Sequence, residues 1–94
     1  MIVVADEIDK LSYTPYYVQL ADLLAAKIGG GDLAPGDPLP SESYLQQQYG
    51  LARGTVRTAI RLLNERGLVR TIQGRGTYVL PRPDKPEKPD KPEK

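Results

Sequence analysis

The sequence predicts a mainly α domain that ends in a small β-hairpin, an α+β fold of the winged helix-turn-helix class. Three segments between residues 15 and 66 carry apolar residues at helical spacing, and a short glycine-containing turn separates the second from the third. After Gly67 the apolar spacing shortens from about 3.6 to about 2, over two runs rich in β-branched residues. Three helices followed by a two-stranded wing therefore account for residues 14–80.

The first helix is expected to begin at Pro15, with Thr14 as its capping residue. Gly29-Gly30-Gly31 ends it. This triple glycine lacks the Gly-Lys-Ser/Thr of a phosphate-binding loop. Residues 32–37 then form a turn. Helical spacing assigns these residues to the inward face of the helix: Tyr17, Leu20, Ala21, Leu23, Leu24 and Ile28.

Two further helices follow, joined by a tight turn. Ser41 is expected to cap a second helix over residues 42–49, which Gly50 ends. After Leu51 and Ala52, the third helix runs from about Arg53 to Arg66. The expected core residues of these helices are Leu45, Tyr49, Val56, Ile60 and Leu63.

Two strands are expected at residues 68–72 and 77–80, on either side of Gln73-Gly74-Arg75-Gly76. The two glycines suit a hairpin turn. The Gly-Arg-Gly tip can bring a backbone and one guanidinium close to a groove of DNA.

The two ends of the chain have a different character from the domain. Residues 1–13 show no clear period and are expected to be a flexible leader. Residues 81–94 contain the hexamer PDKPEK twice, with proline at every third position, which matches the turn of polyproline II. With no apolar residue to bury, this tail is expected to be a disordered spacer. A weak electrostatic or protein-docking role is the alternative.

Composition excludes several classes of function. The chain has neither Cys nor His, so disulfides, thiolate or imidazole metal sites and the usual nucleophilic triads lack their main residues. No metal and no cofactor is expected. No apolar run reaches the roughly 18 residues of a membrane span, and no signal peptide precedes the domain, so a cytoplasmic protein is expected.

The positive charge is concentrated in the second half of the domain. Residues 14–49 carry one lysine against four acids, whereas residues 50–80 carry six arginines against Glu65 alone. A basic half on a near-neutral chain indicates a polyanionic partner, with a solvated basic face as the alternative. Arg61 lies two turns into the third helix and is expected to be a surface charge, with Glu65 as its possible partner. Arg66 and Arg70 are also expected to be solvated.

Three segments resemble the DNA-binding domain of the GntR family of bacterial transcription regulators, in order and in spacing. They are "GDLAPGDPLPSE" (31–42), "YGLARGTVRTAIRLLNERGLV" (49–69) and "QGRGTYV" (73–79). The leader and wing are most similar to the HutC-type branch of that family. The resemblance implies that the third helix lies in the major groove of DNA and that the wing lies at the minor groove.

The resemblance also implies roles for particular residues. Arg53 stands at the position that contacts bases, and an arginine fork suits a guanine edge. Thr55 and Arg57 stand where the family holds phosphate or bases, and Gly74 stands at the wing position that approaches the minor groove. Gly54 leaves space for the DNA. The expected DNA-contacting residues are Ser41, Ser43, Arg53, Gly54, Thr55, Arg57, Thr58, Gln73, Gly74 and Arg75.

Three positions depart from the family pattern. Ser43 stands where the family commonly has a DNA-contacting arginine, and Ala52 stands where Ser or Thr is common. Tyr44 replaces the glutamate that would complete a capping box with Ser41. These departures predict weaker affinity or a different operator.

The leading hypothesis is a sequence-specific transcription regulator, a repressor that binds a near-palindromic duplex as a homodimer. Its half-sites would lie on the order of one helical turn apart. A small-molecule effector is expected only if a C-terminal domain exists outside this chain. The alternative is a winged helix that binds an acidic protein, because fold alone does not decide function. An enzyme is least favoured, because the acids are scattered over helix ends and turns.

Overall fold

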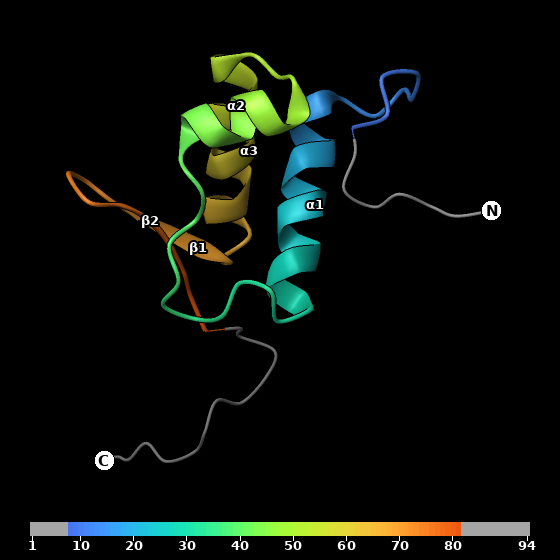
Figure 1. Ribbon diagram of the computed structural model, residues 1–94. Helices are drawn as coiled ribbons and strands as arrows, with labels where there is room; N and C mark the ends of the chain where they lie inside the picture. The colour runs from blue at the N-terminus through green and yellow to red at the C-terminus, as the bar shows by residue number, and fades with distance from the viewer. Residues whose placement is uncertain (1–7, 82–94) are drawn as a thin grey trace, which may run out of the picture.

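The computed structural model describes residues 8–81, and in this range the chain forms three helices and one hairpin (Figure 1). The helices are α1 (Tyr16–Gly29), α2 (Glu42–Tyr49) and α3 (Arg53–Glu65). The strands β1 (Val69–Ile72) and β2 (Gly76–Val79) pair antiparallel. The predicted three helices followed by a two-stranded wing are therefore confirmed. Both copies of the PDKPEK hexamer lie outside the described residues.

The start of α1 differs from the prediction. Pro15, not Thr14, occupies the N-cap position, and no side chain caps the helix. Because the helix begins one residue later than expected, Thr14 lies outside the capping position. The residues before the helix are held instead by the side-chain amide of Gln19. Its Nε2 donates to the carbonyls of Asp9 and Thr14 at 3.0 and 2.9 Å. Ile8, ahead of the expected domain start, also packs against the core.

The helix-turn-helix turn follows from two local signals. Ser41 Oγ accepts a hydrogen bond from Tyr44 N at 3.0 Å, so the predicted cap of α2 is confirmed. Gly50 ends α2 in the left-handed conformation, at φ 67° and ψ 41°, a region that glycine enters at little cost. Leu51 then turns inward with 6% of its surface exposed, and α3 begins two residues later.

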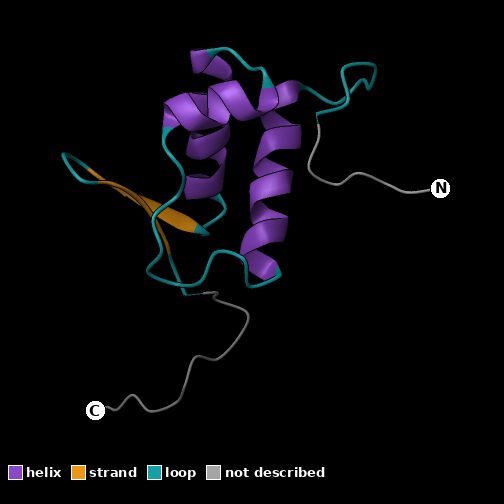
Figure 2. Cartoon of the chain, viewed as in Figure 1, coloured by secondary structure: helices purple, strands orange, loops and turns teal. Residues whose placement is uncertain are grey.

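The core lies between α1 and α3, and α2 and the hairpin close it (Figure 2). Val56, Ala59 and Leu63 of α3 are fully buried, and so is Leu20 of α1. Three predicted core positions are corrected. Tyr17 is 37% exposed, and Tyr49 and Ile60 are only half-buried against the core. The buried stripe of α3 runs through Ala59, so Ile60 lies at its edge.

The segment after α1, expected to be only a turn, also pairs with the hairpin. Gly36 N donates to Val79 O at 2.8 Å, and Val79 N donates to Asp37 O at 2.9 Å. Leu39 N donates to the carbonyl of the Thr77 residue at 2.8 Å. Pro38 lies between these residues, opposite Tyr78 of β2. Proline has no N–H to donate, and the pairing bonds here are made by its neighbours instead. The outer edge of β2 is therefore covered by residues 36–39.

The hairpin extends beyond the helices on the side of α3 away from α1 (Figure 1). Val69 pairs with Val79, and both are buried, while the tip residues Gln73–Gly76 are exposed. Gly74 has φ 81°, as a tight hairpin turn requires. β1 begins one residue later than predicted and ends where predicted, whereas β2 begins and ends one residue earlier than predicted. None of the helices in residues 8–81 has the length and apolar character to cross a membrane.

Candidate nucleic-acid interface

The N-terminal half of α3 presents its arginines to solvent. The side chains of Arg53 and Arg57 are 64% and 54% exposed, and Gly54 between them is also exposed. Thr55 and Thr58 are half-buried on the same helix. This end of the helix therefore offers guanidinium donors and a glycine backbone to a partner.

Glu42, which was not among the expected site residues, holds both arginines. Arg57 Nε donates to the two carboxylate oxygens of Glu42 at 3.1 and 3.3 Å. Arg53 Nε lies 3.6 Å from Glu42 Oε1. Within residues 8–81, the contacts of both arginines run through Nε, which leaves the terminal nitrogens of each guanidinium to face a ligand. An acid in the first turn of α2 is also favoured by the helix dipole.

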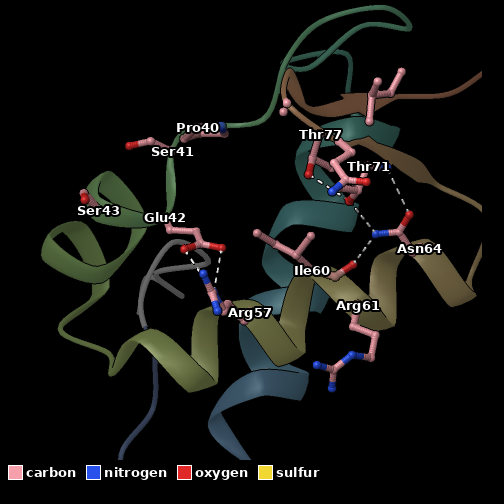
Figure 3. A pocket seen from close by; sticks show the side chains of 14 residues that line it. Pro40, Ser41, Glu42, Ser43, Arg57, Ile60, Arg61, Asn64, Thr71 and Thr77 are labelled. Carbon is pink, nitrogen blue, oxygen red and sulfur yellow. Dashed lines mark hydrogen bonds and ion pairs between the residues drawn. The ribbon is translucent and has the colours of Figure 1, made fainter.

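A groove of about 690 Å³ lies between α2, α3 and the hairpin (Figure 3). One wall is the N-terminus of α2, the floor includes Ile60 and Asn64 of α3, and the other wall is the hairpin. Five of the expected DNA-contacting residues line it, namely Ser41, Ser43, Arg57, Gln73 and Gly74. The other five lie outside it: Arg53, Gly54, Thr55, Thr58 and Arg75.

Arg61 of α3 and Arg66, the residue that follows this helix, differ in their surroundings. Arg61 lines the same groove, and no ion pair within the described range joins it to Glu65. Arg66 Nη1 lies 3.0 Å from Asp22 Oδ1, so it links the end of α3 to α1. The expectation that Arg66 is simply solvated was therefore wrong.

These features define a winged helix-turn-helix domain with a basic helix end beside a groove. The chain belongs to the GntR family of bacterial regulatory proteins, whose family model matches residues 16–79. It is 48% identical over 69 residues to the mannosyl-D-glycerate transport/metabolism system repressor MngR of Escherichia coli. That match covers 73% of this chain but 29% of MngR.

Solved structures show the same fold. YtrA of Sulfolobus acidocaldarius, a GntR-family transcription factor, is 35% identical with a TM-score of 0.76, over 84% of this chain and 83% of that one. The DNA-binding domain of AraR, in complex with operator ORX1, is 37% identical with a TM-score of 0.70. That likeness covers 76% of this chain and 88% of the AraR chain.

Proposed function

We propose that this chain is the sequence-specific DNA-binding domain of a transcription repressor. The observation that carries the proposal is the exposed Arg53–Arg57 end of α3, which lies beside a groove closed by a glycine-tipped wing. MngR is named a repressor, and the AraR domain is bound to operator DNA. This chain spans 29% of MngR, so the likeness to MngR supports the DNA-binding step alone.

In this proposal α3 enters the major groove and the wing lies at the minor groove. Arg53 contacts a guanine edge through its two terminal nitrogens, which the Glu42 contact leaves open. Arg57 and the hydroxyls of α2 and α3 hold phosphates, which fixes the register of the helix. The supporting hydroxyls are Ser41, Ser43, Thr55 and Thr58. Gln73, Gly74 and Arg75 approach the minor groove from the wing tip.

The organisation of the chain is part of the same proposal. Residues 14–80 form the DNA-binding domain, 1–13 a leader and 81–94 a spacer. Two copies bind a near-palindromic operator, each reading one half-site. The protein acts in the cytoplasm, and it responds to a small-molecule effector only if a C-terminal domain exists outside this chain.

Selection of bound sites from a random duplex pool tests the proposal. We expect enrichment of a two-fold symmetric sequence with a guanine in each half-site. Retention on random duplex at low salt without any enrichment would contradict sequence-specific reading. No retention on duplex or on heparin would favour the alternative, a winged helix that binds an acidic protein.

Gly54→Ala is expected to raise stability and to lower DNA affinity. Apart from its chain neighbours and the backbone of its own helix, an added Cβ at Gly54 would meet no atom of residues 8–81 within 4 Å, so packing does not require glycine there. Alanine favours a helix over glycine by up to about 1 kcal/mol. In the complex, the added methyl group would meet the DNA that the helix end approaches.

Urea unfolding and gel-shift titration on the selected duplex measure the two effects of Gly54→Ala. Gly31→Ala is the control, because Gly31 also has open space around it but lies after α1, away from the groove. Its φ of 92° predicts lower stability, with unchanged affinity of the folded protein. A Gly54→Ala variant that binds as tightly as the wild type would refute close approach at this residue.

A further inference from the structure

One side chain near the end of α3 connects the helix to β1 directly and, through Thr71, to β2. Asn64 Nδ2 donates to Thr71 Oγ1 at 3.0 Å, and Asn64 Oδ1 accepts from Thr71 N at 3.2 Å. The same Nδ2 donates to the Ile60 carbonyl at 3.1 Å within α3. The Thr71 and Thr77 hydroxyl oxygens lie 3.0 Å apart (Figure 3). Both amide hydrogens and the amide oxygen of Asn64 are therefore used.

The register of the hairpin places this network at the base of the wing tip. Thr71 and Thr77 are directly opposite each other, and the tip, Gln73–Gly76, begins two residues beyond Thr71. Asn64, Thr71 and Thr77 all line the groove between α3 and the hairpin. A bond made here joins α3 to the base of the tip, where it can fix the angle between the helix and the wing.

The two edges of the hairpin are held in different ways. Backbone bonds from residues 36–39 cover the edge of β2. On the edge of β1, the N–H of Thr71 points away from β2 and donates to Asn64 Oδ1. An apolar residue at position 64 could fill the same space, but it would supply no directional bond to this N–H.

We propose that Asn64 is the positioning residue of the wing, which sets the separation between the reading end of α3 and the wing tip. That separation decides whether one molecule reaches the major groove and the adjacent minor groove together. The structural part of the inference stands without DNA, and its consequence for binding depends on the proposed function.

Distance measurements between two spin labels test the structural part directly. The chain has no native cysteine, so Gln47→Cys on α2 and Gln73→Cys on the wing tip give two unique, exposed labelling sites. We expect Asn64→Ala to broaden or shift the distance distribution. The matched control, Glu65→Ala, changes the exposed neighbour on the same helix and is expected to leave the distribution unchanged. Identical distributions for Asn64→Ala and the wild type would overturn the proposal.

Thr77→Val and Thr77→Ser keep the test decisive if Asn64→Ala fails to fold. The valine variant removes the hydroxyl that bonds Thr71, whereas the serine variant keeps it. We expect broadening with valine and the wild-type distribution with serine. The same distribution for valine and serine would show that the hydroxyl network does not hold the wing.

A double-mutant comparison tests the consequence for DNA, with the selected duplex as probe. If Arg75→Ala weakens wild-type binding about tenfold, it should weaken Asn64→Ala binding only about twofold, because a mispositioned tip has less contact to lose. Equal factors in both backgrounds would overturn positioning by Asn64. If Arg75→Ala has no effect in the wild type, the wing part of the proposed function fails, and the spin-label result still decides the structural part.

Discussion

Arg53→Ala is expected to weaken binding to the selected duplex by about 5- to 150-fold, while binding to random duplex falls much less. The range corresponds to about 1–3 kcal/mol for one good bidentate contact to a base. Arg53 begins α3 with 64% of its side chain exposed, and only the N-terminal part of a recognition helix normally reaches base edges. Its loss should therefore reduce specificity more than general affinity for DNA.

Gel-shift titration on selected and random duplex measures this difference. Arg61→Ala is the matched control, because it removes the same charge from the same helix about two turns later. We expect Arg61→Ala to weaken both duplexes by similar, smaller factors. Equal losses on the two duplexes for Arg53→Ala would show that Arg53 holds phosphate and reads no base.

Leu63→Ala is expected to lower the free energy of unfolding by about 2–5 kcal/mol, the usual range for truncating a buried leucine. Leu63 is fully buried in the cluster that joins α1, α3 and the hairpin. A domain of this size has a small margin of stability, so a loss of this magnitude populates the unfolded state at moderate temperature. DNA binding should be lost with the fold.

Thermal and urea unfolding followed by circular dichroism measure the change. Leu62→Ala makes the same chemical change at the neighbouring, half-buried position and should lower stability clearly less. If the two variants were equally stable, Leu63 would not be a central packing residue. If Leu63→Ala stayed folded at low temperature, its affinity for the selected duplex should match the wild type.

Local signals allowed most of the helical framework to be predicted. Ser41 caps α2 through a bond to a residue three positions on, and Gly50 ends the same helix by its own backbone conformation. Signals of this range are contained in a few consecutive residues. The exception is Thr14, where the helix began one residue later than its signals indicated.

The features that the sequence did not reveal depend on pairs far apart along the chain. Glu42 is bonded to Arg57 across 15 residues, and residues 36–39 pair with β2 some 40 positions later. Arg66 likewise pairs with Asp22. Such contacts follow from how the elements pack, and in the sequence alone Glu42 was only an acid beside a cap. The groove itself was unpredictable for the same reason, because it needs α2, α3 and the hairpin together.

The Glu42 carboxylate between two arginines changes how many salt ions DNA binding should release. Two arginines and one carboxylate carry a combined charge of +1, so DNA in contact with this cluster replaces fewer bound cations than its guanidinium groups suggest. On B-DNA the cluster should add about −0.9 to the slope of log affinity against log salt, not about −1.8. A salt titration would therefore report a smaller positive charge at this helix end than its two guanidinium groups carry, by about one charge for each bound copy.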